Sequence, residues 1–320
     1  MSTEAEPKKK RLSKVFEYMK HEDPFQGGLA FCPGCSLELL LRFIPRVLGN
    51  DIVITGTPSC SAPVLLGQNT GTWHKLAYYG TLMTGADATG LVRYYNRKGI
   101  DNTVVCFNGD GTAADIGFSN LSGAAERNEP FIYICYDNEG YMNTGIQKSS
   151  TTPFGAKTTT TPVGGAESGK NIRKKNLAMI MAMHKIPYTA TATLSHLEDL
   201  ADKLLKAKKM KDQGFCFLHV FSPCPTGWGM APEKGIELCR SAVKTNFYPL
   251  WEAENGCFRF TRETKKPKPV SEYAKLAKKY SHMTEEELDV LQRDIDYEYH
   301  VLQKMMEIED TCPLPFSLET

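Results

Sequence analysis

A carboxylate and an amide stand where this sequence could bind a metal ion and an anion. Asp110 lies between two glycines in FNGDGTAAD, after the apolar run that begins at Thr103, and Asn138 follows a second apolar run in ICYDNEGY. If both runs are parallel strands of one sheet, the two side chains emerge at the same edge. Gly109 and Gly111 have no side chain, so a bulky anion could approach the backbone closely.

These residue types suit a magnesium site. A lone aspartate repels a phosphate group, whereas an aspartate with an amide oxygen can bind Mg²⁺, which takes about six oxygen ligands in an octahedral array. Asp110, Asn138, a main-chain carbonyl near Gly140, two diphosphate oxygens and a water would complete the set. The helix expected from Ala113 would direct its N-terminus toward the same anion. Gly-Asp-Gly also forms ordinary turns, so this motif alone does not distinguish the two interpretations.

Four cysteines lie beside proline or glycine, where backbone turns can bring thiols together. Cys32 and Cys35 form a C-x-x-C pair in FCPGCSLE, Cys60 lies in TPSCSAP, and Cys224 lies in FSPCPTGW. Four thiolates suit a zinc ion or a 4Fe-4S cluster, unrelated thiols are a third interpretation, and a thioredoxin-like dithiol leaves two of the four unexplained. The remaining cysteines are expected to be packing residues or inert thiols, at positions 106, 135, 216, 239, 257 and 312.

The composition predicts a globular protein with no global electrostatic field. The chain has 320 residues, of which 41% are hydrophobic, and a formal net charge of +1. This charge does not favour nucleic acid or an anionic membrane as a partner. Because no apolar run approaches the roughly 20 residues of a membrane span and no signal peptide is evident, we expect a cytoplasmic protein, whose cysteines are thiols or metal ligands.

The elements that position these residues alternate between strand and helix. This order is typical of βαβ units and predicts an α/β fold, a parallel sheet with helices on both faces. Strands are expected at 51–57, 103–109, 130–138 and 215–223, and helices at 36–48, 84–97, 113–127 and 171–184.

Three regions are expected along the chain: a disordered leader at 1–14, a main domain at 15–262 and a helical C-terminal extension at 263–320. The extension contains a capping box at Thr284 and Glu287. Its apolar positions predict a packed helix, on its own domain or on a partner: Leu288, Leu291, Ile295, Leu302 and Met306. The Thr, Gly and Pro-rich segment 148–165 has no periodicity and is expected to be a long loop, either covering a ligand or forming a surface excursion.

Taken together, the motifs resemble the β subunit of 2-oxoacid:ferredoxin oxidoreductases. The resemblance covers about residues 25–262 and includes C-P-G-C, T-P-S-C, the GDG with NEGYMNTG, the TTTTPVG loop and S-P-C-P-T-G-W. It implies the diphosphate-binding half of the thiamine diphosphate-binding fold, holding thiamine diphosphate, Mg²⁺ and a 4Fe-4S cluster. It also implies that Asp110, Asn138 and the Gly140 carbonyl bind Mg²⁺, and that the cluster ligands are Cys32, Cys35, Cys60 and Cys224.

The same resemblance implies the remaining site residues. Asn143 matches a family residue that contacts substrate, and Thr144 and Gly145 would line the same pocket. Other residues expected at the cofactor are Gly109, Gly111, Tyr141, Cys60 and His74, the last of which could instead be a core histidine. The chain departs from the family at Gly28-Leu29, where a Gly-His pair is frequent, and at Ser36, where glycine is frequent.

The implied activity is the coenzyme A-dependent oxidative decarboxylation of a 2-oxoacid, with electrons passing through the cluster to ferredoxin. Pyruvate is the family default, and phenylglyoxylate, branched-chain or indolic 2-oxoacids and oxalate are alternatives. Other subunits, of the α, γ and δ types, would supply the glutamate at the aminopyrimidine, the coenzyme A site and further clusters. A non-redox thiamine lyase or decarboxylase would not need clustered thiolates, and a binding module with structural zinc is the remaining alternative.

Overall fold

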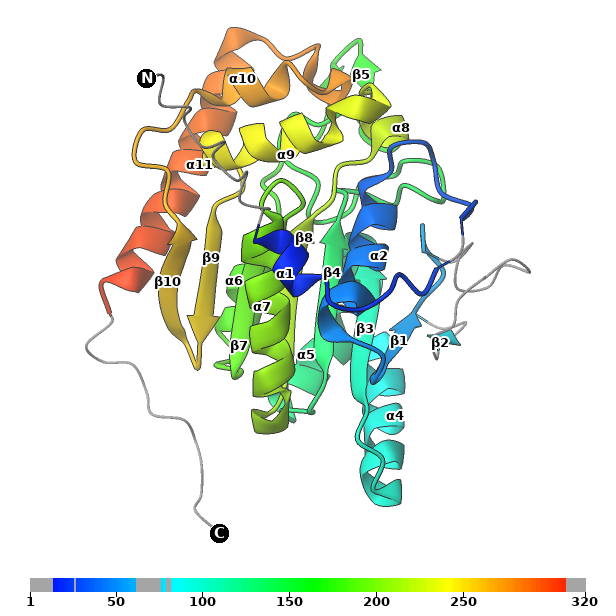
Figure 1. Ribbon diagram of the computed structural model, residues 1–320. Helices are drawn as coiled ribbons and strands as arrows, with labels where there is room; N and C mark the ends of the chain where they lie inside the picture. Colours follow the sequence, from blue (N-terminus) through cyan, green and yellow to red (C-terminus); the bar gives the residue numbers. More distant parts are fainter. Residues whose placement is uncertain (1–13, 26, 62–75, 79–81, 309–320) are drawn as a thin grey trace, which may run out of the picture.

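An eight-stranded sheet forms the centre of the computed structural model, which describes residues 14–25, 27–61, 76–78 and 82–308 (Figure 1). The strand order is β10-β9-β7-β8-β4-β3-β1-β2. The strands are β1 (Ile52–Gly56), β2 (Leu76–Tyr78), β3 (Thr103–Gly109), β4 (Ile132–Asp137), β7 (Tyr188–Thr193), β8 (Cys216–Phe221), β9 (Leu250–Glu254) and β10 (Cys257–Arg262). A separate hairpin pairs β5 (Val163–Gly164) with β6 (Glu167–Ser168).

The predicted parallel sheet is confirmed, with an antiparallel edge that was not predicted. The six neighbouring strands from β7 to β2 pair in parallel. Strand β9 runs antiparallel to β7, and β10 runs antiparallel to β9. The turn between β9 and β10 is short, so the two strands form a hairpin, which needs no crossover helix.

Helices cover both faces of the sheet. They are α1 (Val15–Tyr18), α2 (Ser36–Leu48), α4 (Thr84–Lys98), α5 (Phe118–Glu126), α6 (Leu177–Ala182), α7 (Leu197–Met210), α8 (Pro225–Trp228), α9 (Gly235–Lys244), α10 (Val270–Ala274) and α11 (Glu285–Met306). Helices α2 and α7 lie on one face, and α4, α5 and α6 lie on the other (Figure 1). Alternate residues of β4 serve the two layers: Ile132 and Ile134 face α2 and α7, and Tyr133 and Cys135 face the opposite layer.

Two of the predicted helices differ from the observed ones. The segment expected as one helix at 113–127 begins with a π-helical turn, Thr112–Ile116, and α5 follows after Gly117. Such turns widen the helix locally and are frequent at functional sites. The helix expected at 171–184 is shorter, because Asn176 caps α6 by accepting a hydrogen bond from Met179 N. The helix predicted at 36–48 has the same bounds as α2 and contains Pro45.

Cys257 corrects the cysteine prediction, since it is part of a disulfide bond and is not a thiol. It begins β10 and is only partly buried, so the core does not enclose its sulfur. The four other packing cysteines in the described residues are buried free thiols: Cys106, Cys135, Cys216 and Cys239. The predicted leader lies outside the described residues except for Lys14, as does Cys312.

The C-terminal extension packs on its own chain. Thr284 and Glu287 form the predicted capping box at the start of α11. Leu291 and Ile295 are buried in one cluster with residues of α9 and α10, and Leu302 packs with Trp251 of β9. None of the described helices is both long enough and apolar enough to cross a bilayer.

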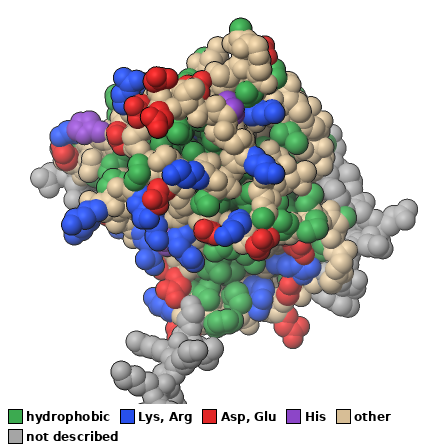
Figure 2. All heavy atoms as spheres, turned by 90° about the horizontal axis from the view of Figure 1, so that it is seen from above, with side chains coloured by type: hydrophobic (Ala, Val, Ile, Leu, Met, Phe, Trp, Pro, Cys, Tyr) green, Lys and Arg blue, Asp and Glu red, His purple; other side chains and the backbone are tan. Residues whose placement is uncertain are grey.

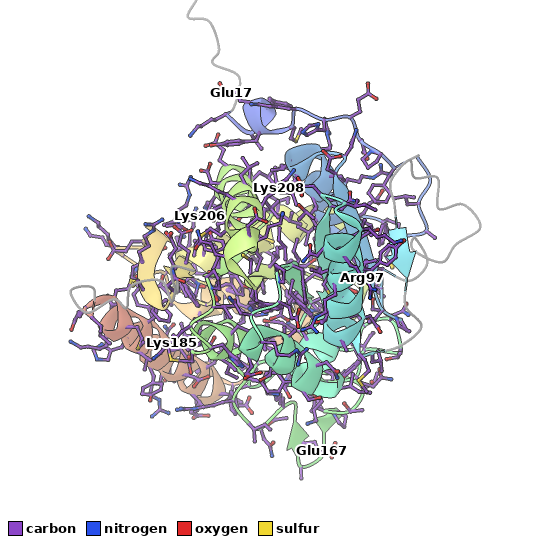
Figure 3. All side chains as sticks on the ribbon, turned by 90° about the horizontal axis from the view of Figure 1, so that it is seen from below. Glu17, Arg97, Glu167, Lys185, Lys206 and Lys208 are labelled. Carbon is purple, nitrogen blue, oxygen red and sulfur yellow. The ribbon has the colours of Figure 1, made fainter. Side chains whose placement is uncertain are left out.

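Polar side chains also fix the helices to the sheet and to each other. On α7, which carries the labelled Lys206 and Lys208 in Figure 3, Lys208 donates a hydrogen bond to Leu48 O of α2, at 2.6 Å. On the face seen from above, basic and acidic side chains are interspersed (Figure 2), in keeping with the net charge of +1.

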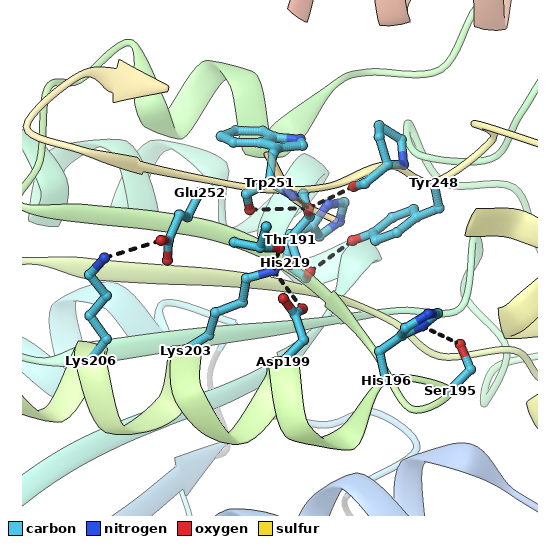
Figure 4. A network of polar contacts seen from close by, with 12 residues as sticks. Thr191, Ser195, His196, Asp199, Lys203, Lys206, His219, Tyr248, Trp251 and Glu252 are labelled. Carbon is cyan, nitrogen blue, oxygen red and sulfur yellow. Dashed lines mark hydrogen bonds and ion pairs between the residues drawn. The ribbon is translucent and has the colours of Figure 1, made fainter. Parts of the chain in front are cut away.

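A buried lysine joins α7 to the antiparallel edge of the sheet (Figure 4). Lys203 is 1% exposed, and burial lowers its pKa. Its ammonium donates to Asp199 Oδ2 at 2.6 Å, to Thr191 O of β7 at 2.7 Å and to Thr261 Oγ1 of β10 at 2.8 Å. These bonds replace the water that the charge loses.

Replacing Lys203 by methionine is expected to lower the free energy of unfolding by about 3 to 5 kcal/mol, because it leaves the Asp199 carboxylate buried without its partner. Chemical denaturation measures the loss. The control is Lys209→Met on the same helix, where the side chain is exposed and the expected change is within about 0.5 kcal/mol. Equal losses in the two variants would contradict the role of the buried pair.

Candidate cofactor site

The ends of β3 and β4 bring Asp110 and Asn138 together, as the sequence predicts. The two strands are parallel neighbours, with Gly109 opposite Tyr136. Asn138 N donates a hydrogen bond to Asp110 Oδ1, at 3.2 Å. Both residues are buried, with Asp110 fully enclosed. The parallel register therefore places a carboxylate and an amide side by side, although 28 residues separate them in the chain.

Three oxygen positions converge as ligands of one Mg²⁺ would. The terminal atom of the Asn138 amide that faces Asp110 lies 3.0 Å from Asp110 Oδ1 and 2.8 Å from Gly140 O. Oxygens in this arrangement repel unless the amide turns its NH₂ toward them or a cation lies among them. Octahedral Mg²⁺ with bonds of 2.0–2.1 Å holds neighbouring oxygens roughly 2.9 Å apart. The residues present therefore fit the ion.

The Thr-rich loop closes over the Asp110 carboxylate. Ser149 Oγ donates to Asp110 Oδ2 at 2.5 Å, and Thr151 Oγ1 contacts the same oxygen at 2.9 Å. Burial raises the pKa of Asp110 well above its usual range, and the nearby Asp137 carboxylate raises it further. A cation bound here would oppose both effects, since it favours the ionised carboxylate.

Lys170 binds main-chain carbonyl groups of this loop. Its ammonium donates to Ser150 O at 3.1 Å and to Thr152 O. Burial lowers the pKa of Lys170 to about 8. Residues 149–152 of the loop are thus held at the site, next to the buried Lys170 ammonium, whereas residues 159, 160, 162, 164 and 165 are exposed.

A pocket with an empty volume of about 660 Å³ opens above the paired strand ends. Gly111 lies on its wall, and a Cβ atom there would come within 2.5 Å of the Tyr141 ring. The Tyr141 hydroxyl also donates to Gly111 O, at 2.9 Å. The second glycine of the GDG motif is therefore required by the close approach of an aromatic ring.

Most of the predicted cofactor residues line this pocket: Gly109, Gly111, Asn138, Gly140, Tyr141, Asn143, Thr144 and Cys60. Asp110 lies buried beside it, and Gly145 is not among the lining residues. His74 lies outside the described residues. The sequence interpretation missed the lining residues Pro58, Ser59, Leu82, Thr112, Tyr136 and Met142, of which Pro58 and Ser59 had a signal in their position after a strand.

The turns that carry Cys35 and Cys224 are bound to each other. Ser36 follows Cys35 and starts α2, and its hydroxyl contacts Ser222 Oγ at 2.9 Å and donates to Pro223 O at 2.7 Å. Ser36 is the position at which the sequence departs from the family pattern, and its hydroxyl gives this bridge a hydrogen bond that glycine could not make.

The four predicted cluster ligands lie within electrostatic range of one another. Burial raises the pKa of Cys35 to about 11 and that of Cys60 to about 12, and the neighbouring thiols of Cys224 and Cys32 contribute to both shifts. Cys60 also interacts with Asp110 and lines the pocket. Within the described part of the chain, no three His, Cys, Asp or Glu side chains are grouped tightly enough to hold a single metal ion.

Comparison with known proteins identifies related sequences and a related structure. The model of the thiamine pyrophosphate enzyme C-terminal TPP binding domain matches residues 63–220. The chain is 42% identical to the β subunit of NADH-dependent phenylglyoxylate dehydrogenase of Aromatoleum evansii, over 89% of this chain and 65% of that subunit. It is 43% identical to pyruvate synthase subunit PorB of Methanocaldococcus jannaschii, over 86% of this chain and 95% of that subunit.

A third relative and a solved structure are also similar to this chain. Ketoisovalerate oxidoreductase subunit VorB of Pyrococcus horikoshii is 39% identical, over 94% of this chain and 97% of that subunit. The 2-oxoglutarate:ferredoxin oxidoreductase of Magnetococcus marinus is 26% identical with a TM-score of 0.53, over 68% of this chain and 70% of that chain. The chain therefore belongs to the family of 2-oxoacid:ferredoxin oxidoreductase β subunits, which are thiamine diphosphate-dependent enzymes.

Proposed function

We propose that this chain carries thiamine diphosphate, Mg²⁺ and a 4Fe-4S cluster in a complex that oxidises a 2-oxoacid to an acyl-coenzyme A and CO₂. Two electrons would leave one at a time through the cluster to ferredoxin. The observation that supports this most directly is Cys60, which lines the cofactor pocket and interacts with the other three cysteines. One residue would thus adjoin both the organic cofactor and the cluster.

Within the site, each residue has a distinct task. Asp110, Asn138 and the Gly140 carbonyl would hold Mg²⁺, and the ion would neutralise the diphosphate. The bound cofactor would supply the nucleophile for the 2-oxo carbon and an electron sink for decarboxylation. Asn143, at the exposed rim of the pocket, would contact the substrate. Ser149 and Thr151 would keep the Asp110 carboxylate oriented.

These four thiols could hold a cluster or a structural zinc, and the position of Cys60 at the cofactor pocket favours the cluster. Thiolates bound to one tetrahedral zinc at about 2.3 Å would lie roughly 3.8 Å from each other. The thiols here interact electrostatically with one another. Because a 4Fe-4S cube binds its thiolates at four separate iron corners, it requires a wider arrangement.

Other subunits would complete the site. The lining residues Asn143 and Thr144 are exposed, so the mouth of the pocket is open to a partner surface. The glutamate that acts on the aminopyrimidine, the coenzyme A site and further clusters are proposed to lie on those subunits. The substrate is proposed to be pyruvate, with the 2-oxoacids of the phenylglyoxylate and branched-chain type as alternatives, because relatives with these three substrates are similarly close.

The decisive experiment is anaerobic purification of the chain with its accompanying subunits, followed by assay of thiamine diphosphate, iron and turnover. We expect a brown protein that reduces ferredoxin with one 2-oxoacid of a panel of pyruvate, 2-oxoisovalerate and phenylglyoxylate, and that requires coenzyme A. A colourless preparation with zinc in place of iron would favour the structural-zinc alternative. A preparation containing neither iron nor thiamine diphosphate would refute the proposal.

A further inference from the structure

A second buried lysine comes from the C-terminal extension. Lys279 lies in the short 3-10 turn Lys278–Tyr280, and its side chain is 3% exposed. Its ammonium forms an ion pair with Glu139, whose side chain is 1% exposed. A charge this deeply buried is costly unless it is paired and hydrogen-bonded, so this contact ties two distant parts of the chain together.

Glu139 is the middle residue of the proposed magnesium loop, between Asn138 and Gly140. Its φ is +61°, in the left-handed region that glycine favours and other residues rarely adopt. Its backbone is held on both sides, since Glu139 N donates to Asp137 Oδ1 at 2.9 Å and Thr152 Oγ1 donates to Glu139 O at 2.7 Å. The ion pair with Lys279 also holds the side chain of this strained residue in place.

The same ammonium reaches the turn that carries Cys224. Lys279 Nζ lies 3.2 Å from the centroid of the Trp228 ring. Trp228 ends helix α8, which starts directly after Cys224, and its Nε1 donates to Asn138 O at 2.9 Å. Cys224 Sγ accepts a hydrogen bond from Gly227 N at 3.2 Å, which fixes the thiol within that turn.

The turn around Lys279 also binds the loop that covers Asp110. Lys279 O accepts a hydrogen bond from Lys157 N at 3.0 Å. Three residues beyond the turn, Met283 packs so closely on Gly155 that a Cβ atom on that glycine would overlap it. One short segment of the extension thus contacts the magnesium loop, the Cys224 turn and the Thr-rich loop.

We propose that Lys279 is a positioning residue that holds the magnesium loop and the Cys224 turn in the arrangement that binds both cofactors. This inference rests on the proposed function of the site. Lys279 acts on the proposed ligands through Glu139 and Trp228. Its position gives the C-terminal extension a role in cofactor binding, in addition to its packing on the sheet. Because the ammonium lies over the Trp228 ring in the Cys224 turn, its charge would also favour the reduced, more negative state of a cluster bound there.

The test is Lys279→Met in the complex as purified, which keeps the apolar stem and removes the ammonium. The dissociation constant of thiamine diphosphate with Mg²⁺ is expected to rise about 10- to 100-fold, the usual effect of losing a partner that orients a metal ligand. The midpoint potential of the cluster is expected to become more negative. Lys278→Met, on the exposed neighbouring residue, is the matched control and is expected to change neither quantity.

A second variant separates positioning from charge balance. Glu139→Gln combined with Lys279→Met leaves no unpaired buried charge and is expected to fold, as far-ultraviolet circular dichroism and co-purification of the other subunits will show. A raised dissociation constant in this folded double variant supports the inference. A wild-type dissociation constant and a wild-type cluster spectrum there would overturn it, whereas wild-type protein without iron or thiamine diphosphate would refute the proposed function instead.

Discussion

Asp110→Ala is expected to abolish binding of thiamine diphosphate while the proposed iron-sulfur cluster remains. The carboxylate is fully buried and faces the converging oxygens of Asn138 and Gly140, so its loss removes the charged ligand of the proposed Mg²⁺. Without the ion, the diphosphate loses its divalent counter-charge at the strand ends. We expect the affinity for the cofactor to fall by more than about 100-fold. Loss of a residue that only orients a metal ligand costs about 10- to 100-fold, and Asp110 is proposed to be a ligand itself.

Isothermal titration and cofactor analysis of the purified complex measure this effect. Asp101→Ala is the matched control, because Asp101 lies just before the same strand and its side chain is 97% exposed. Asp110→Asn keeps the shape of the side chain and the contacts with Ser149 and Thr151, so it separates loss of charge from collapse of the loop. Thiamine diphosphate at wild-type occupancy in Asp110→Ala would remove Asp110 from the ligand set.

Cys224→Ser is expected to damage the proposed cluster and to leave the fold intact. Cys224 is the N-cap of α8, and its sulfur accepts the hydrogen bond of Gly227 N. Serine is among the preferred N-cap residues, so the substitution keeps the cap while it removes the thiolate. The expected result is a lower iron content and weaker visible absorbance, with unchanged circular dichroism.

Cys239→Ala provides the comparison for this variant. Cys239 is a buried thiol in α9 and belongs to the hydrophobic cluster around Phe221 and Leu238, so its loss should not alter the iron content. Wild-type iron in Cys224→Ser would exclude Cys224 as a ligand. A loss of iron that also occurs in Cys239→Ala would show that destabilisation, rather than a missing ligand, is the cause.

The local sequence around the site was informative because the residues concerned end neighbouring parallel strands. Asp110 follows β3 and Asn138 follows β4. Because these neighbouring parallel strands end at the same edge of the sheet, their side chains come together there. The hydrophobic spacing of α2 and the capping box of α11 are likewise local, and both were confirmed. Helix α7 was missed although Leu197, Leu200 and Leu204 have helical spacing, so its signal was present in the sequence.

Other features could not be obtained from local patterns. The hairpin of β9 and β10 forms the antiparallel edge of the sheet because β9 pairs with β7. A local pattern does not show which strand of the sheet a hairpin will pair with. The hydroxyls of Ser149 and Thr151 reach Asp110 across 39 and 41 residues of chain, and no spacing rule identifies them among the many Ser and Thr residues of the loop. The disulfide of Cys257 was also unexpected, because its sequence context resembles that of the buried thiols.

By itself, the sequence determined the chemistry that can be done here: a carboxylate and an amide at two strand ends, and four thiols beside turn-forming residues. These follow from residue type and short-range spacing, which fix local backbone geometry. Only the tertiary structure decided which distant groups support that chemistry, such as Lys279, whose partner Glu139 lies 140 residues away. A buried lysine and an exposed one have the same local sequence signal, and only packing around the side chain distinguishes them.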